Sequence, residues 1–265
     1  MKFVRFASAA HPDGVYGIVG PAGIEVISGG LFDTVEKSGE IVKEGYITEY
    51  LPPIDPPNII AIGLNYVDHA SESSSKLPEQ PLFFMKPSTS VTGHLCDVML
   101  PKMAPTQVDY EAEMCIIIGK TARHISREEA ADHIFGYTCG MDISARDCQF
   151  GDGQWIRGKG FDTFAPLGPY VTTDFDPSNS RVSMRLNGQT MQDEPTSSMV
   201  FDVPTLVSYL SQWATLRPGT VILTGTPSGV GFARTPPVYL REGDICECDI
   251  EGLGVLKVNI VAECI

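Results

Sequence analysis

Short apolar stretches separated by turn residues dominate the pattern of hydrophobic and polar positions along the chain. The apolar runs at residues 58–63, 110–118 and 221–224 have the length of buried strands. Residues 244–250 and 254–260 each alternate apolar and polar positions, which predicts a hairpin with one buried face. The chain is therefore expected to be rich in strands.

The first 51 residues form a separate pattern. Residues 14–19 and 24–27 flank a Gly-Pro-Ala-Gly turn, which is typical of a β-hairpin. Residues 31–44 are interpreted as a helix, although their charges give little periodicity. We therefore predict a small N-terminal α/β unit, rich in strands, over residues 1–51.

Residues 52–57 contain four prolines and separate this unit from the rest of the chain. Proline fixes φ and donates no N–H, so such a run makes a stiff connector. A second domain is predicted over residues 58–265. Its helix signals are few: a capping box at residues 126–129 and Asp202 as an N-cap before Pro204.

The order of these elements restricts the fold. Strands do not alternate regularly with helices, which argues against a Rossmann sheet or a TIM barrel. The prediction is an α+β fold whose large core is dominated by strands.

Composition and charge restrict the function. Hydrophobic residues make up 43% and charged residues 20%, the balance of a globular protein. Lys and Arg number 19 against 33 Asp and Glu, giving a formal charge of −14. This charge argues against nucleic acid, which needs a basic face, and against an anionic membrane surface. No apolar run reaches the roughly 20 residues of a membrane span. Carboxylates in excess are, however, what a hard metal ion needs.

The cysteines and the N-terminus indicate the compartment. The seven cysteines include no CxxC pair, so reduced thiols are expected. The first six residues alternate apolar and polar positions, which is typical of a strand rather than a signal peptide. We predict an intracellular protein, cytoplasmic or mitochondrial.

Residues 109–118 carry the strongest chemical signal. Glu111 and Glu113 would point to the same face of a strand whose remainder is strongly apolar. Two like charges so close repel each other, which favours a cation between them, whereas the alternative is an edge strand with a solvated face. A third ligand is expected within residues 140–147. Ligands that are all oxygen select Mg²⁺, Ca²⁺ or Mn²⁺.

Three further features could carry chemistry. Lys159 lies between glycines, where its ammonium could neutralise an oxyanion, or it is an ordinary surface lysine. His69 and Glu72 are three residues apart, so a helical turn would pair them as a general base, or as a surface hydrogen bond. Residues 71–75 have the composition of a lid. The Gly-rich residues 224–231 lack the ending of a P-loop but could hold a carboxylate.

Taken together, these segments resemble the fumarylacetoacetate hydrolase family. The matching motifs occur in the family's order and extend over about residues 58–263; they are residues 63–69, 109–113, 142–147, 158–163 and 223–227. Residues 236–240 look most like the branch called fumarylacetoacetate hydrolase domain-containing protein 2.

The resemblance implies a β-rich roll that binds a divalent metal, usually Mg²⁺ (Mn²⁺ or Ca²⁺ being alternatives), and usually a homodimer. It implies that the metal ligands are Glu111, Glu113 and Asp142. It implies a water-activating dyad of His69 and Glu72 with the catalytic lysine Lys159. The substrate contacts would be Arg146, Gln149 and Thr226. Leu64 stands where related acylpyruvate hydrolases often have arginine, which affects how the far end of the substrate is bound.

The function expected from both lines of reasoning is a metal-dependent hydrolase. It would cleave a C–C bond in 2,4-dioxo acids such as acylpyruvates or fumarylpyruvate, through an enolate that the metal stabilises. The same site would support a keto–enol tautomerase or a decarboxylase acting on oxaloacetate. A metal-binding interaction protein without turnover is a further alternative. The expected partner is a small anionic 2-oxo acid, with no nucleic acid and no membrane.

Overall fold

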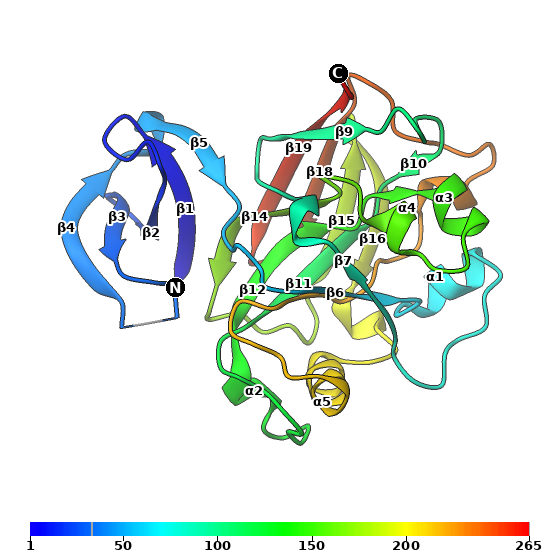
Figure 1. Ribbon diagram of the computed structural model, residues 1–265, viewed down its shortest axis with the longest axis horizontal. Coiled ribbons are helices and arrows are strands. Elements are labelled where there is room, and N and C mark those ends of the chain that lie inside the picture. The colour runs from blue at the N-terminus through cyan, green and yellow to red at the C-terminus, as the bar shows by residue number, and fades with distance from the viewer. Residues whose placement is uncertain (33, 265) are drawn as a thin grey trace.

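The computed structural model describes residues 1–32 and 34–264. Five strands lie within the first 51 residues: β1 (Lys2–Ser8), β2 (Val15–Gly20), β3 (Gly23–Ser28), β4 (Glu36–Val42) and β5 (Ile47–Leu51). β2 and β3 pair antiparallel up to the contact of Gly20 with Gly23, which confirms the predicted hairpin. Figure 1 shows these strands gathered at the left-hand end of the molecule.

The helix predicted over residues 31–44 is wrong. The described part of this segment contains strand β4, which pairs antiparallel with β3, followed by a 3₁₀ turn, η1 (Glu44–Tyr46); Asp33 lies outside the described residues. Gly39 adopts a positive φ of 82° inside β4, a conformation that a helix does not allow. Pairing with β3 satisfies the backbone groups of a segment whose side chains gave no helical periodicity.

The remaining strands form the body of the protein. They are β6 (Ile59–Gly63), β7 (Leu82–Lys86), β8 (Val91–Thr92), β9 (Asp97–Leu100), β10 (Val108–Asp109), β11 (Ala112–Ile118), β12 (Ile134–Met141), β13 (Ser144–Ala145), β14 (Ala165–Thr172), β15 (Arg181–Leu186), β16 (Gln189–Pro195), β17 (Val221–Leu223), β18 (Ile245–Ile250) and β19 (Gly254–Ala262). The predicted apolar strands are thus β6, β11 and β17, and the predicted C-terminal hairpin is β18–β19.

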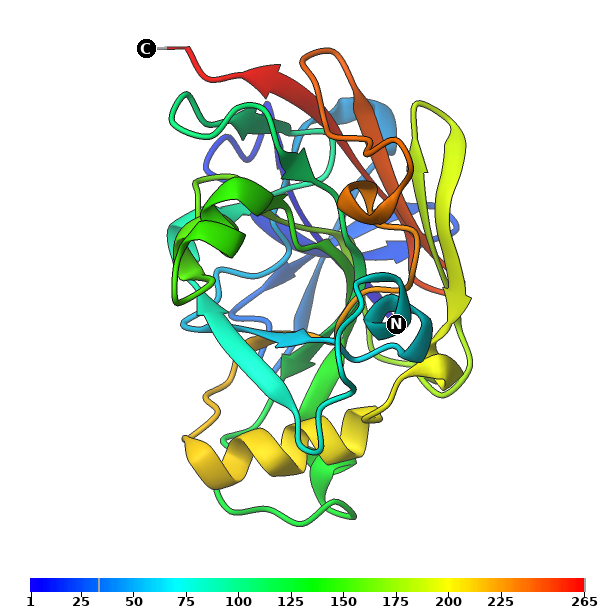
Figure 2. The ribbon, with the colours of Figure 1, turned by 90° about the vertical axis from the view of Figure 1, so that its right-hand side faces the viewer.

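The helices are short. They are α1 (Val67–Glu72), α2 (Ala130–His133), α3 (Arg146–Gly151), α4 (Ile156–Lys159) and α5 (Val203–Trp213), with 3₁₀ turns η2 (Ser88–Ser90), η3 (Thr196–Ser198) and η4 (Gly231–Ala233). Asp202 caps α5 by accepting a hydrogen bond from the N–H of Thr205, as predicted. The predicted capping box also forms, since Ser126 and Glu129 exchange hydrogen bonds. Figure 2 shows α5 as the long yellow helix along the bottom of the molecule.

Two sheets account for nearly all of these strands. Within the described residues, the larger sheet has 12 strands in the order β4-β3-β2-β1-β14-β12-β11-β17-β6-β7, with β5 beside β1 and β8 beside β14. The smaller sheet has five strands in the order β16-β15-β18-β19-β9, and β10 pairs with β13. The architecture confirms the predicted α+β fold with a strand-dominated core.

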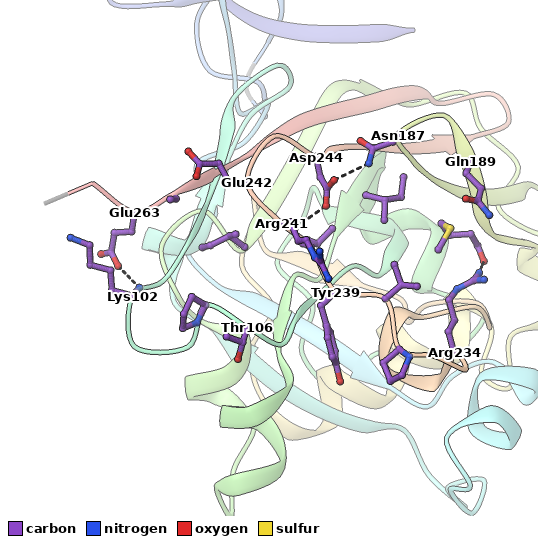
Figure 3. Close-up of a pocket in the computed structure, with 18 residues that line it drawn as sticks. Lys102, Thr106, Asn187, Gln189, Arg234, Tyr239, Arg241, Glu242, Asp244 and Glu263 are labelled. Atoms are coloured by element: carbon purple, nitrogen blue, oxygen red, sulfur yellow. Dashed lines mark hydrogen bonds between the residues drawn. The ribbon is translucent and has the colours of Figure 1, made fainter.

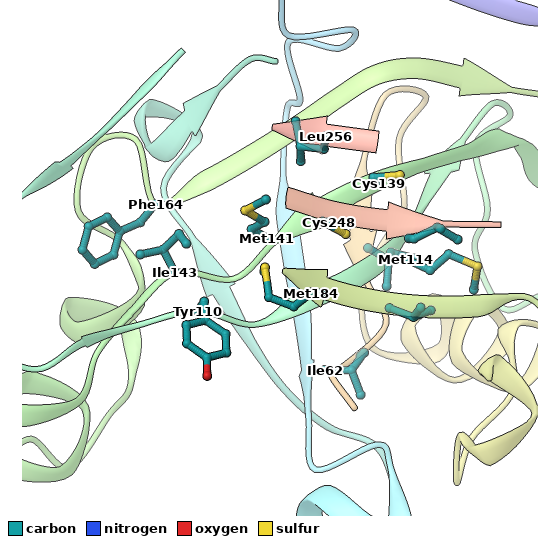
Figure 4. Close-up of a cluster of buried hydrophobic side chains, with 14 of the residues drawn as sticks. Ile62, Tyr110, Met114, Cys139, Met141, Ile143, Phe164, Met184, Cys248 and Leu256 are labelled. Carbon is teal, nitrogen blue, oxygen red and sulfur yellow. The ribbon is translucent and has the colours of Figure 1, made fainter. Parts of the chain in front are cut away.

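The two sheets pack face to face around the main hydrophobic core. Strands β11 and β12 of the larger sheet contact β15 and β18 of the smaller one. Figure 4 shows Met114, Met141, Met184, Cys139 and Cys248 filling the space between them. All five side chains are fully buried. Each buried side chain of this size contributes about 1.5–3 kcal/mol to folding, so this layer provides a rigid base for the loops at its edge.

The N-terminal strands are continuous with the larger sheet. Lys2 and Phe3 of β1 pair with Thr172 and Val171 of β14. The division at the proline-rich connector therefore separates two stretches of sequence that share a sheet. The boundary between domains stays a prediction.

Two further observations concern membranes and thiols. In residues 1–32 and 34–264, no helix is both long and apolar enough to cross a bilayer. The seven cysteines, all within the described residues, are free thiols, as expected.

Candidate metal centre and catalytic pocket

Strand pairing brings three carboxylates together. Glu111 directly precedes β11, Glu113 is its second residue, and Asp142 directly follows β12. Ala112 pairs with Met141, and the N–H of Asp142 donates to the carbonyl of Glu111 at 3.0 Å. Ligand oxygens of the three carboxylates consequently lie within 4.8 Å of one another. All three residues are at most 4% exposed, which excludes the solvated-edge interpretation.

A third strand completes this edge. β17 pairs antiparallel with β11, so the Gly-rich residues after β17 run back alongside the carboxylates. The N–H of Gly225 donates to Oε2 of Glu113 at 2.6 Å, and Oγ1 of Thr226 donates to the carbonyl of Ala112 at 2.9 Å. The neighbouring strand β6 leads directly into the turn that carries α1. The glycine-rich segment thus holds one carboxylate of the candidate metal centre, Glu113.

Three buried cations neutralise most of this charge. Nζ of Lys159 donates to Glu111 at 2.7 Å and to Asp142 at 2.8 Å. Lys86 donates to the other oxygen of Asp142. Arg146 forms ion pairs with Asp109 at 2.9 Å and with Glu111 at 2.8 Å. These partners hold Glu111 and Asp142 in fixed positions.

The pKa shifts show how unevenly the charge is balanced. Burial alone would raise the pKa of Glu111, but Lys159 and Arg146 outweigh it and lower that pKa to about 2. Burial and the charges of Asp142 and Glu111 raise the pKa of Glu113 well above its usual range. Among the described residues, Glu113 has no Lys or Arg within ion-pair distance.

This arrangement fits a divalent metal. Three buried carboxylates offer oxygen ligands only, the donor set of Mg²⁺, Mn²⁺ or Ca²⁺. Glu113 is the carboxylate that lacks a counter-ion, and a bound cation would supply one. Residues Glu111, Glu113 and Asp142 can therefore hold a metal ion.

The predicted dyad forms on the short helix α1. Nδ1 of His69 lies 2.8 Å from Oε1 of Glu72, one helical turn away. The other carboxylate oxygen of Glu72 accepts a hydrogen bond from the N–H of Gly229 at 2.8 Å. His69 is only 7% exposed, so this pair is not a surface hydrogen bond. Figure 1 shows α1 close to α3 and α4, at the end of the molecule opposite the N-terminal strands.

One small cavity is lined by most of the candidate site residues. It has a volume of about 90 Å³, and its floor is formed by the three carboxylates with Lys159. His69 lines one side, together with Ser73 and Ser75 of the predicted lid. Aromatic side chains surround the mouth: Phe84, Phe150, Trp155 and Phe232. A much larger open groove of about 1010 Å³ lies elsewhere, and the predicted site residues are not among those that line it.

Comparison with known proteins agrees with this geometry. The sequence profile described as fumarylacetoacetate (FAA) hydrolase C-terminal matches residues 58–261, most of the chain. The chain belongs to the fumarylacetoacetate hydrolase family.

Named relatives and solved structures support this assignment. The chain is 44% identical over 222 residues to the Dictyostelium discoideum fumarylacetoacetate hydrolase domain-containing protein 2 homolog, covering 78% of this chain and 72% of the relative. It is 41% identical over 226 residues to human oxaloacetate tautomerase FAHD2A, mitochondrial, covering 83% and 72%. A solved 5-carboxymethyl-2-hydroxymuconate delta-isomerase from Mycobacterium smegmatis superposes with a TM-score of 0.89 at 37% identity, covering 99% and 100% of the two chains.

The residues expected to contact substrate also lie in this cavity. Arg146, Gln149 and Thr226 all line it. Nη1 of Arg146 donates to Oε1 of Gln149 at 2.8 Å, which orients the amide with its NH₂ group still available. Oγ1 of Thr226 accepts from the amide of Gln192 at 2.8 Å and is therefore fixed in place. Their roles in binding substrate stay a prediction.

Two features of the family motifs differ from the expectation. Lys159 lies in helix α4 rather than in a loop, and it is 2% exposed. Gly158 is required there because a Cβ would approach the N of Gln149 to 2.6 Å, so the glycine lets α4 pack against α3. Leu64, at the position of the missing arginine, has a positive φ of 55° and lines the cavity as an apolar group.

Sequence reasoning missed Lys86 and Asp109. Lys86 is the last residue of the apolar strand β7 and is 2% exposed. A single lysine at the end of an apolar run was the sequence signal that could have indicated a buried, paired cation. Asp109 accepts hydrogen bonds from Arg146 and from the N–H groups of Gly231 and Phe232. It connects β10 to the loop after β17, a long-range role with no local sequence signal.

Proposed function

We propose that this protein is a divalent-metal-dependent enzyme that catalyses keto–enol tautomerisation of a small 2-oxo acid of the oxaloacetate type. The observation that carries the proposal is the His69–Glu72 pair, which shares one small cavity with three buried carboxylates. A base and a metal centre at opposite sides of a cavity are suited to moving a proton on the carbon beside a carbonyl group.

The size of the cavity supports a small substrate. Its volume of about 90 Å³ is well below the roughly 300–1,000 Å³ of sites for drug-sized ligands. The names of relatives, oxaloacetate tautomerase and delta-isomerase, describe reactions that move a proton without breaking a C–C bond. A four-carbon 2-oxo diacid agrees with both observations.

Glu72 prepares His69 for proton transfer. Nδ1 of His69 faces the carboxylate of Glu72, and in the tautomer whose Nδ1–H donates to it, Nε2 of the imidazole is the acceptor. In the keto form, Nε2 takes a proton from C3 while the C–H electron pair forms the C2–C3 double bond. The same proton is then delivered to the 2-oxygen, which gives the enol with no water consumed.

The floor of the cavity would stabilise the charge that develops on the 2-oxygen. A bound divalent metal, which we propose is Mg²⁺, supplies Lewis acidity at this end of the substrate. The ammonium of Lys159 lies between Glu111 and Asp142 and adds a positive charge there, because these carboxylates raise its pKa against the opposing effect of burial. The amide NH₂ group of Gln149 is positioned to bind the carboxylate of the substrate.

The test presents enol-oxaloacetate to the purified protein with Mg²⁺ and with EDTA, and follows ketonisation spectroscopically. We expect a metal-dependent rate that falls by about 10²–10⁴-fold in His69→Asn, with Mg²⁺ affinity unchanged. No metal-dependent rate on any 2-oxo acid would remove the enzyme proposal and leave the metal-binding protein without turnover. Release of CO₂ in the same assay would point to the decarboxylase instead.

Hydrolytic cleavage of 2,4-dioxo acids is the second candidate. The observation that favours it is the carboxylate-backed imidazole, because Glu72 and His69 together can remove a proton from water. Water attack on the C4 carbonyl would then break the C3–C4 bond and release pyruvate and a carboxylic acid. Detection of pyruvate from an acylpyruvate, at a rate exceeding oxaloacetate ketonisation, would promote this reaction over the tautomerase.

A further inference from the structure

The backbone of Gly229 is held by hydrogen bonds on both sides of its Cα. Its N–H donates to Oε2 of Glu72 at 2.8 Å, on the side of the catalytic cavity. Its carbonyl accepts hydrogen bonds from Nε of Arg234 at 3.2 Å and from the hydroxyl of Tyr110 at 3.2 Å. This N–H and this carbonyl belong to the two peptide groups that meet at the Gly229 Cα, so the backbone conformation of Gly229 links Arg234 to Glu72, and through Glu72 to His69.

Arg234 is itself anchored to the smaller sheet. Its Nη2 donates to the carbonyl of Met191 in β16 at 2.6 Å, and its Nε also lies 3.2 Å from the hydroxyl of Tyr110. Tyr110 is fully buried and directly precedes the metal-binding Glu111. One guanidinium thus joins the loop after β17 to two parts of the rigid core.

Close packing at Gly229 restricts the conformation of the loop after β17. Gly229 has a positive φ of 102°, and a Cβ at this residue would lie 2.1 Å from the carbonyl oxygen of Met191. Only glycine fits this close approach. The same Met191 carbonyl receives the hydrogen bond from Arg234, so backbone packing and the guanidinium fix the loop at one point.

The other side of Arg234 lines the large open groove (Figure 3). Figure 3 shows Arg234 at one end of this groove, with Arg241 nearer its centre. Arg241 lines the same groove and carries the same charge. In the described residues, its side chain has no ion-pair partner. The groove is therefore lined by two arginines that can be compared by mutation. Of these, Arg234 donates to the carbonyl of Gly229, whose N–H donates to Glu72.

We propose that Arg234 is a positioning residue for the His69–Glu72 dyad and acts through the backbone of Gly229. Without the guanidinium, the Gly229 carbonyl keeps only the Tyr110 hydroxyl as a side-chain donor, and the φ and ψ angles of Gly229 are held less firmly. A change in these angles moves the N–H away from Glu72, which then no longer fixes the tautomer and direction of the His69 ring. The inference rests on the proposed role of this dyad in proton transfer.

The experiment compares Arg234→Met with Arg241→Met in the full-length protein loaded with Mg²⁺. Both variants remove one positive charge from the groove. We expect kcat for oxaloacetate ketonisation to fall between about tenfold and a hundredfold in Arg234→Met, because misplacing a catalytic group costs this much. KM and Mg²⁺ affinity should stay within threefold. Arg241→Met should retain the kcat of the unmodified protein, and equal losses in the two variants would overturn the proposal.

A double-mutant cycle separates positioning from a general structural role. If Arg234 acts through Glu72, then adding Arg234→Met to Glu72→Gln should lower kcat no further. Additive losses would mean that Arg234 only supports the fold. Should Arg234→Met fail to fold, Tyr110→Phe removes the other side-chain donor to the Gly229 carbonyl and should give a smaller loss of the same kind, also absent in the Glu72→Gln background.

A second readout does not depend on activity. Hydrogen exchange of the peptide containing α1 should be faster in Arg234→Met than in Arg241→Met, because the tether on Glu72 is weakened. Equal exchange in both variants would overturn the positioning role. If the unmodified protein shows no turnover with any 2-oxo acid, the proposed function fails, and the exchange comparison still decides whether Arg234 holds the helix.

Discussion

Gly225 donates its backbone N–H to Oε2 of Glu113 at 2.6 Å, across 112 residues of sequence. Gly225 has a positive φ of 95°, and a Cβ there would lie 2.7 Å from the Cβ of Asn65. Asn65 in turn donates to the carbonyl of Thr224 at 2.7 Å and is fully buried. A glycine in the chain's last third therefore orients a candidate metal ligand in its middle.

Gly225→Ala should weaken both folding and metal binding. The methyl group cannot fit beside Asn65, so the loop must move and Glu113 loses its N–H donor. The matched control is Gly243→Ala, because Gly243 has a similar φ of 89° and open space at its Cβ position. We expect the control to lose only about 1 kcal/mol of stability from backbone strain, with unchanged Mg²⁺ affinity by calorimetry. Equal effects of the two substitutions would contradict the steric argument.

Binding of Mg²⁺ should release a proton over a range of pH set by Glu113. Burial with the charges of Asp142 and Glu111 raises the pKa of this carboxyl, so the metal-free protein keeps it protonated above the usual range. A metal ligand must be ionised, and affinity should therefore increase as pH rises toward the raised pKa. Titration calorimetry in buffers of different ionisation enthalpy measures the proton release directly. Proton release that is absent in Glu113→Gln would identify the group.

The same shift has a consequence for stability. A carboxyl whose pKa is higher in the folded than in the unfolded protein stabilises the fold at low pH, and this contribution is lost as pH rises above the unfolded value. Without metal, Glu113 should therefore make the protein less stable as pH rises above its unfolded pKa. Glu113→Gln should flatten that part of the pH profile of thermal unfolding. An identical profile in the variant would exclude Glu113 as the source.

Lys86→Met should strongly destabilise the metal-free protein. Lys86 is fully enclosed and donates to Asp142, and removing one partner of a buried ion pair typically costs about 3–5 kcal/mol. Lys37→Met is the control, because Lys37 pairs with Glu25 at the surface and its side chain is 62% exposed. Denaturant unfolding should show a loss of at most about 1 kcal/mol for the control. Similar losses in both variants would mean that burial adds little to the pair with Asp142.

Trp155→Ala should widen the range of substrates. The Trp155 ring stands over Gly63, at 2.7 Å from the position of a Cβ, and packs edge-on against Phe84 with ring centroids 5.4 Å apart. Removing the ring opens the apolar end of the cavity. We expect kcat/KM for a long-chain acylpyruvate, relative to oxaloacetate, to rise about tenfold or more. Trp213→Ala, which removes a ring packed at a tilt against Phe83 outside the cavity, should leave this ratio unchanged.

Much of the fold and site was predictable because the signals are local. The apolar run of β11 and the alternation of β18 and β19 encode strands directly. The same run, with Glu111 and Glu113 two residues apart, pointed to the carboxylate pair. His69 and Glu72 share one helical turn, so their contact also follows from spacing.

The rest depends on contacts between distant parts of the chain. Lys86 meets Asp142 across 56 residues, and Asp109 meets Arg146 across 37. Strand order alone brings these groups together, and no pattern in one segment specifies that order. The failure over residues 31–44 has the same origin, because the open edge of β3 determines that β4 is a strand.

The pairing of β1 with β14 bears on how the protein can be cut. A fragment beginning after the proline-rich connector would retain the cavity and its residues. It would also leave the end of β14, at Val171 and Thr172, without its partners Phe3 and Lys2, and Val171 is a buried apolar residue. Exposed strand edges can pair with strands of other chains and cause aggregation. Such a shortened protein would therefore tend to precipitate, and expression trials should retain the first 51 residues even where chemistry is the only interest.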